Sequence, residues 1–178
     1  MSAAGVELRQ VTEEDWQLWR DLRHRVLTTD PEAFGSTLAL EQAFTERDWR
    51  RRVARGRSFV AWLEGRPVGM GGVVPEEEPG TWSVVAMWVE PSARGRGIGR
   101  RVLEHLLATV PPEDDVLLSV ADGNPARDLY ARVGFVATGE VAPLRPGSSA
   151  TKSRMVRRGS RTRNVLPRPG SDSTRIEP

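Results

Sequence analysis

The segment from residue 94 to residue 100 has the residue types and spacing of an anion-binding turn. It alternates three glycines with basic and apolar residues, in the order Arg94, Gly95, Arg96, Gly97, Ile98, Gly99 and Arg100. An apolar stretch precedes this segment and an amphipathic pattern follows it. The first amides of a helix have no intrahelical partner and lie at its positive end, where they bind anions. Because glycine has no Cβ, a bound group can approach the backbone closely. The pattern therefore predicts a phosphate or pyrophosphate site.

Two common phosphate-binding motifs are excluded by the spacing. A P-loop requires Gly-x4-Gly-Lys-Ser/Thr, which the chain lacks, and a dinucleotide fingerprint that began at Gly97 would require glycine at Val102. A plain turn with solvated arginines is the remaining alternative. It is disfavoured because three alternating glycines cost backbone entropy that a simple connection does not need.

A strand and a helix are expected to position this turn. Residues 82–89 are apolar except for Ser83, which is typical of a strand buried on both faces of a sheet. The helix is predicted from apolar residues four apart, and it ends before two prolines at 111–112. Residues 116–120 then form another buried strand. A strand, a helix and a strand in this order predict a parallel crossover.

The rest of the chain predicts three more helices and five more strands. Helices are expected to begin near Thr12 and Thr45, and a short one covers residues 125–133 with Gly134 as its C-terminal cap. Strands are expected at residues 6–9, in a hairpin over residues 58–74, and at residues 135–141 and 152–156. The chain is thus predicted to be an α/β protein.

Composition narrows the classes of function. Among 178 residues there is no cysteine, and His24 and His105 are isolated, so we expect no disulfide, no thiol nucleophile and no metal site. No apolar run approaches the roughly 18–20 residues of a membrane span, and the first residues do not resemble a signal peptide. These observations lead us to expect a cytoplasmic protein without a membrane partner.

Positive charge is concentrated at the C-terminal end. Residues 157–178 hold six arginines against Asp172 and Glu177, a net charge of +4, although the whole chain carries only +2. We therefore predict a domain over residues 1–157 and a basic, disordered tail over residues 158–178. A nucleic-acid partner for this tail is not expected, because the tail has no aromatic residue to stack on bases.

Two segments resemble a known family. The pattern Arg94-x-x-Gly97-x-Gly99 is similar to the Arg/Gln-x-x-Gly-x-Gly/Ala signature of the GNAT superfamily of N-acetyltransferases, whose turn and helix hold the pyrophosphate of acetyl-CoA. Residues 124–135, which contain Asn124, Tyr130 and a Gly-Phe pair, resemble a later element of the family. The resemblance extends over about residues 4–157, with strong motifs at 87–135.

The resemblance implies the GNAT fold and a set of cofactor contacts. The fold is a mixed, mostly antiparallel sheet of about seven strands, with a parallel pair of fourth and fifth strands and flanking helices. These two strands would diverge so that the backbone binds the pantetheine arm of acetyl-CoA. The implied cofactor-binding residues are Met87, Trp88, Val89, Arg94, Gly95, Arg96, Gly97, Ile98, Gly99, Arg100 and Asn124.

The resemblance also implies direct transfer of an acetyl group from acetyl-CoA to a primary amine of a small molecule or a peptide, without a metal. Tyr130 matches the acid that protonates the departing thiolate. The family often places a glutamate at the positions of Ser83 and Ser119. Two candidates for the general base therefore stay open, a water relay through these two hydroxyls and a carboxylate such as Glu41. Glu41 itself is expected to be a solvated helix residue. A non-catalytic domain that binds acyl-CoA is the alternative function, and a homodimer is left open.

Overall fold

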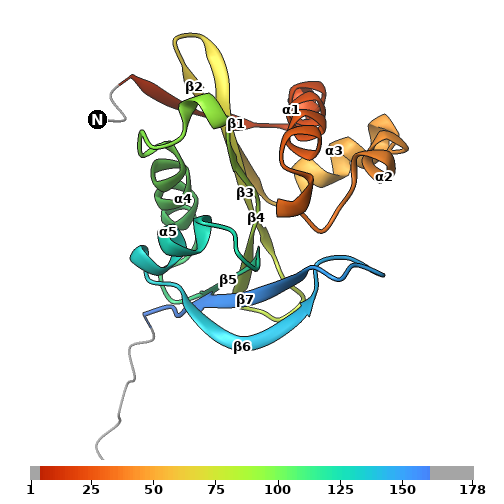
Figure 1. Ribbon diagram of the computed structural model, residues 1–178. Coiled ribbons are helices and arrows are strands. Elements are labelled where there is room, and N and C mark those ends of the chain that lie inside the picture. Colours follow the sequence, from red (N-terminus) through yellow and green to blue (C-terminus); the bar gives the residue numbers. More distant parts are fainter. Residues whose placement is uncertain (1–4, 161–178) are drawn as a thin grey trace, which may run out of the picture.

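The computed structural model describes residues 5–160, which form one mixed sheet in the strand order β1-β2-β3-β4-β5-β7-β6 (Figure 1). The strands are β1 (Val6–Val11), β2 (Arg57–Leu63), β3 (Arg66–Pro75), β4 (Thr81–Val89), β5 (Asp115–Ala121), β6 (Val136–Pro143) and β7 (Thr151–Arg157). β4 and β5 pair in parallel, and the other neighbouring strands pair antiparallel. The expected GNAT sheet with its parallel fourth and fifth strands is confirmed.

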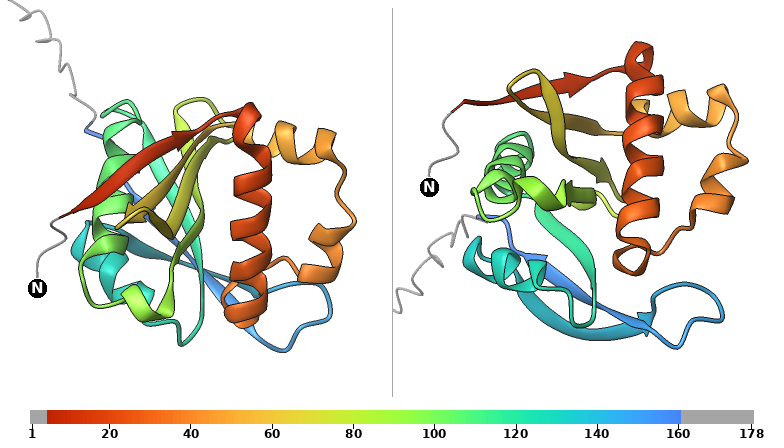
Figure 2. Two further views of the ribbon diagram at one scale, coloured as in Figure 1. Left: turned by 90° about the horizontal axis from the view of Figure 1, so that it is seen from above. Right: turned by 45° about the horizontal axis from the view of Figure 1, so that its top comes forward.

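Helices cover both faces of this sheet (Figure 2). Along the chain they are the 3-10 helix η1 (Glu13–Asp15), α1 (Trp16–Thr29), the 3-10 helix η2 (Pro31–Ala33), α2 (Leu38–Gln42), α3 (Glu46–Ala54), the 3-10 helix η3 (Pro91–Ala93), α4 (Ile98–Ala108) and α5 (Ala126–Arg132). α1 to α3 lie on one face, and α4 and α5 on the other.

The core is divided between these two faces. Val102, Leu103 and Leu106 of α4 pack in one cluster with Phe59. Trp19, Leu22 and Val26 of α1 pack in the other, together with Val60 and Trp88. Phe59 and Val60 belong to different clusters because successive side chains of a strand point to opposite faces.

Local sequence signals account for most element boundaries. α3 begins at a capping box in which the Thr45 amide donates to Asp48 Oδ2 over 2.9 Å and the Asp48 amide donates to Thr45 Oγ1 over 3.3 Å. The hydrogen bonds from Thr45 also lower the pKa of Asp48. α2 was not predicted, because its five residues are too few for an apolar period to emerge.

The last described residues remain in contact with the domain. Arg158 Nη1 lies 2.6 Å from Asp115 Oδ2, and the Gly159 amide donates to Asp115 Oδ1 over 2.9 Å. The Ser160 amide donates to the Pro112 carbonyl over 2.7 Å. The boundary after residue 157 stays a prediction, and residues 161–178 of the expected tail lie outside the described residues. Of the helices within residues 5–160, none is long and apolar enough to cross a membrane.

Candidate active site

β4 and β5 separate after a short stretch of pairing. Thr81, Trp82 and Ser83 pair with residues 115–117, and from Val84 onward β4 has no partner strand on that side within the described chain. The Glu90 amide donates to the Val68 carbonyl on β3 over 2.8 Å. Since amides alternate in direction along a strand, those of Met87 and Val89 point into the opening between β4 and β5. Trp88 pairs with Met70 of β3 instead.

A β-bulge lies in β4 beyond its last pair with β5. Val85 pairs with Gly72 and Trp88 with Met70, so Ala86 and Met87 stand opposite Gly71 alone. Ala86 has a φ of 55°, which is rare for a residue other than glycine. A Cβ on Gly71 would lie 2.6 Å from Met87 Sδ, so any larger residue opposite the bulge would displace the Met87 side chain. No sequence pattern pointed to this bulge.

The glycines of the predicted turn have two different functions. Gly95 and Gly97 have φ values of 76° and 77°, and a Cβ on either would meet no atom within 4 Å. Their positive φ leaves the backbone open to a ligand at the start of α4. Gly99 lies inside α4, where a Cβ would be 3.4 Å from Val89 Cγ2 and from Leu129 Cδ2. Gly99 therefore allows α4 to pack closely on β4 and α5.

The three arginines of the turn are placed differently. Arg94 Nε donates to the Val89 carbonyl over 2.9 Å, and Arg94 Nη2 lies 2.6 Å from Asp30 Oδ2. Arg100 forms an exposed ion pair with Glu104 over 2.7 Å. Arg96 is exposed and makes no side-chain hydrogen bond or ion pair within residues 5–160. Arg94 thus holds the turn itself, whereas Arg96 and Arg100 are accessible to an anion.

Asp30, which sequence reasoning did not single out, connects the end of α1 to this turn. Besides Arg94, its Oδ2 accepts a hydrogen bond from Trp88 Nε1 over 2.8 Å. The Trp88 side chain is buried on the side of the sheet that α1 covers. One carboxylate therefore joins α1, β4 and the glycine-rich turn.

Asn124 lies between β5 and α5, and Tyr130 lies in α5 and is buried in the core cluster that contains α4. Tyr130 packs edge-on against Phe135 with ring centroids 6.2 Å apart. Burial raises the pKa of Tyr130 to about 12, so the hydroxyl keeps its proton at neutral pH. Within the described part of the chain this hydroxyl makes no hydrogen bond. Asn124 Oδ1 accepts from the Ala126 amide over 2.9 Å and so helps to begin α5.

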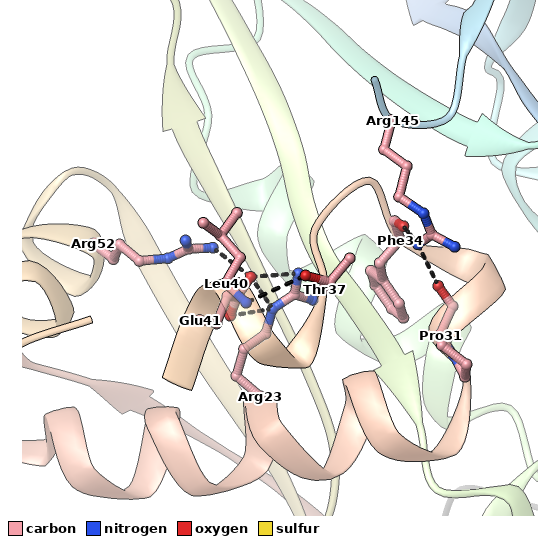
Figure 3. Close-up of polar contacts among 8 residues, drawn as sticks. All are labelled: Arg23, Pro31, Phe34, Thr37, Leu40, Glu41, Arg52 and Arg145. Carbon is pink, nitrogen blue, oxygen red and sulfur yellow. Dashed lines mark hydrogen bonds and ion pairs between the residues drawn. The ribbon is translucent and has the colours of Figure 1, made fainter. Parts of the chain in front are cut away.

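The expectation that Glu41 is a solvated helix residue was wrong. Its side chain has no exposed surface and lies between two arginines (Figure 3). Arg23 Nη2 lies 3.1 Å and Arg52 Nη2 3.5 Å from Glu41 Oε1. The period of a five-residue helix could not indicate which side is buried. A carboxylate held in this way is unsuited to act as a general base.

A second contact joins distant parts of the chain on the same side of the sheet. Arg145, in the connection between β6 and β7, donates from Nη1 to the carbonyls of Pro31 and Phe34 over 3.1 and 3.2 Å (Figure 3). It also forms an ion pair with Glu32 over 3.1 Å. The segment after α1 is thus fixed to the C-terminal strands.

Of the two serines at the positions of the family glutamate, Ser83 alone has a carboxylate partner among residues 5–160. The Ser83 hydroxyl donates a hydrogen bond to Glu76 Oε1. Ser119 is exposed on β5. Within residues 5–160, no group of three or more histidine, aspartate and glutamate side chains is arranged to hold a metal ion.

Comparison with known proteins identifies the family. The model of the acetyltransferase (GNAT) family matches residues 13–135. The chain is 36% identical over 93 residues to an "IAA acetyltransferase" of Azospirillum brasilense, a match that covers 51% of this chain and 61% of the relative. The chain thus spans about three fifths of the length of that curated relative.

Solved structures show the same fold. A GNAT acetyltransferase of Streptococcus pneumoniae superposes with a TM-score of 0.69 at 18% identity, over 85% of this chain and 98% of that one. An acetyltransferase of Salmonella typhimurium, yncA, solved with its cofactor acetyl-CoA, superposes with a TM-score of 0.65 at 17% identity, over 87% of this chain and 94% of that one. Together with the family match, the divergent β4 and β5 and the glycine-rich turn before α4, this establishes that the chain belongs to the GNAT acetyltransferase family.

Proposed function

We propose that this protein transfers the acetyl group of acetyl-CoA directly to a primary amine of a small molecule or a peptide. The observation that carries the proposal is the opening between β4 and β5, which leads to the glycine-rich turn at the start of α4. The described residues fit acetyl-CoA there. The amides of Met87 and Val89 suit the pantetheine arm, and the open backbone at Gly95 and Gly97 suits the pyrophosphate.

The chemistry requires few side chains. A neutral amine attacks the thioester carbonyl carbon, and a bond forms between carbon and nitrogen while the bond between carbon and sulfur breaks. The nitrogen loses a proton and the sulfur gains one. Backbone amides of β4 that face the opening are suited to stabilise the negative charge on the carbonyl oxygen. Tyr130, whose hydroxyl keeps its proton, is suited to donate a hydrogen bond to the departing sulfur.

The proposal is tested by measuring thiol release from acetyl-CoA with a panel of primary amines, using the full chain. Acetylated product and free thiol should appear together, and only with an acceptor present. A protein that binds acetyl-CoA but releases no thiol with any amine would be the non-catalytic acyl-CoA-binding domain instead.

Replacement of glycines in the turn by alanine should strongly weaken the binding of acetyl-CoA. In a Gly97→Ala/Gly99→Ala variant the Kd should rise more than tenfold, a loss above about 1.4 kcal/mol, because residue 97 is strained at positive φ and its Cβ occupies the open space. Calorimetry measures the Kd. Gly139→Ala, which also has positive φ and no atom within 4 Å of the added Cβ, is the control. Unchanged affinity in the folded double variant would remove the turn from the binding site.

Loss of an arginine from the turn should weaken acetyl-CoA binding less than replacement of its glycines. Arg96→Ala should weaken acetyl-CoA binding by less than the double glycine variant, because an exposed charge near a phosphate is screened by water and salt. The loss should shrink further as the salt concentration rises. Arg55→Ala removes the same charge from an exposed position at the end of α3 and is the control. A larger loss for Arg96→Ala than for the glycine variant would show that side-chain charge dominates binding.

A further inference from the structure

Acetylation of an amine requires a group that takes the proton from the attacking nitrogen. Two of the carboxylates on the side of α1 and α2 are already engaged. Glu41 is buried between Arg23 and Arg52, and Asp30 accepts from both Arg94 and Trp88. A proton acceptor must therefore be sought elsewhere along the opening.

Glu76 is held beside the opening by two contacts with β4. Its amide donates to the Thr81 carbonyl over 2.9 Å, and its carboxylate oxygen Oε1 accepts from the Ser83 hydroxyl. Ser83 is the last residue of β4 that pairs with β5. The Glu76–Ser83 pair thus stands where the two strands begin to separate. Both residues are partly buried, so the pair is reachable without being fully solvated.

The face on which Ser83 lies follows from its neighbours. Trp82 and Val84 pack with the cluster under α4, so the side chain between them points to the opposite face, on which α1 and α3 lie. The same argument places Ser119 on that face, because Leu118 and Val120 also pack under α4. Two hydroxyls from adjacent strands therefore lie on one side of the opening, and that of Ser83 is connected to a carboxylate.

Glu76 differs from Glu41 in its ion pairs. Glu76 forms no ion pair with any residue of the described chain, and two further glutamates, Glu77 and Glu78, follow it. A carboxylate of this kind is suited to accept a proton through the hydroxyl that it orients.

We propose that Ser83 and Glu76 form the proton relay of the acetyl transfer, an inference that rests on the proposed function. As the nitrogen bonds to the carbonyl carbon, its proton passes to Ser83 Oγ, and the proton of Ser83 passes to the Glu76 carboxylate. The electron pair of the breaking bond leaves with the sulfur, which takes a proton from the Tyr130 hydroxyl, and water returns a proton to Tyr130. Glu76 then releases its proton to water. Glu76 acts through Ser83 and is therefore a positioning residue.

Replacement of the carboxylate by an amide separates proton transfer from hydrogen bonding. Glu76→Gln retains an oxygen that accepts from Ser83 but takes up no proton, so kcat should fall at least about 10²-fold. The Kd of acetyl-CoA, measured by calorimetry, should stay within about twofold. Glu77→Gln removes the same charge one residue later and should retain full turnover. Introducing Ser83→Glu into the Glu76→Gln protein should restore much of kcat, because a carboxylate then stands on β4 itself.

The outcomes distinguish this inference from the proposed function. Full turnover by Glu76→Gln, with an amine that the unaltered protein acetylates, overturns the relay alone. A parallel loss of acetyl-CoA affinity and kcat in Glu76→Gln also overturns it, because the residue would then only support the fold of the site. Failure of the unaltered protein to release thiol with every amine overturns the proposed function and the relay together.

Discussion

The Glu41→Gln variant is expected to lose about 3–5 kcal/mol of free energy of unfolding, because removal of one member of a buried ion pair leaves its partners with uncompensated charge. Arg23 is the partner whose charge would be left buried, since its side chain is only 6% exposed. Its Nη1 atom is already buried without a hydrogen-bond partner in the described structure. The neutral amide would leave the guanidinium with weaker acceptors and no counter-charge. Denaturant unfolding monitored by tryptophan fluorescence measures the change.

A surface ion pair provides the control for this stability loss. Glu46 forms an exposed pair with Arg50 four residues later, over 2.8 Å. Glu46→Gln should change the free energy of unfolding by less than about 1 kcal/mol, because solvent screens the pair. Similar losses in the two variants would contradict a dominant role for burial at Glu41.

Turnover of the Tyr130→Phe variant is expected to fall by roughly 10²-fold or more, while the affinity for acetyl-CoA stays nearly unchanged, because only the transition state loses a contact. The fold should tolerate the change, since the hydroxyl makes no hydrogen bond within the described residues. A pKa of about 12 exceeds the roughly 8.5 of an ordinary thiol. We therefore expect Tyr130 to share its proton with the sulfur during bond cleavage rather than to lose it beforehand.

The pH dependence provides a second measurement on Tyr130. Its pKa is raised by burial, so the protonated form that acts as donor persists below about pH 12. Turnover should accordingly rise with pH between about 6.5 and 9 as an alkylamine of pKa near 10 becomes neutral, without a descending limb from Tyr130. Full turnover of Tyr130→Phe on an acceptor that the unaltered protein acetylates would exclude the acid role.

Most of the sheet could be predicted because its signals are local. The apolar stretch of β4, the paired turn residues Glu64 and Gly65 with φ values of 51° and 75°, and the capping box at Thr45 each specify a short piece of structure. Insertion of β7 between β5 and β6 is instead a long-range arrangement. Residue patterns predicted the individual strands and the parallel crossover between β4 and β5, whereas the family resemblance supplied their arrangement in one mixed sheet.

The glycine-rich turn could be located from sequence because backbone conformation there depends on glycine itself. The side chains that surround it could not. Asp30 lies 64 residues before Arg94, and Glu76 meets Ser83 only because the chain reverses direction between β3 and β4. Glu41 was misjudged for the same reason, since its partner Arg23 is in another helix. Partners that meet only through the folding of the chain leave no period or motif in the sequence.

The shared carboxylate of Asp30 has a thermodynamic consequence for substrate binding. Its Oδ2 contacts Arg94 of the glycine-rich turn and Trp88 of β4, and Asp30 itself ends α1. A ligand that restricts the turn therefore also restricts the segment after α1, which Arg145 fixes from the other end. Binding of an acceptor that contacts this segment would then be linked to binding of acetyl-CoA, and linkage of binding free energies is reciprocal. Occupancy of the donor site should favour the acceptor to the same extent that the acceptor favours the donor.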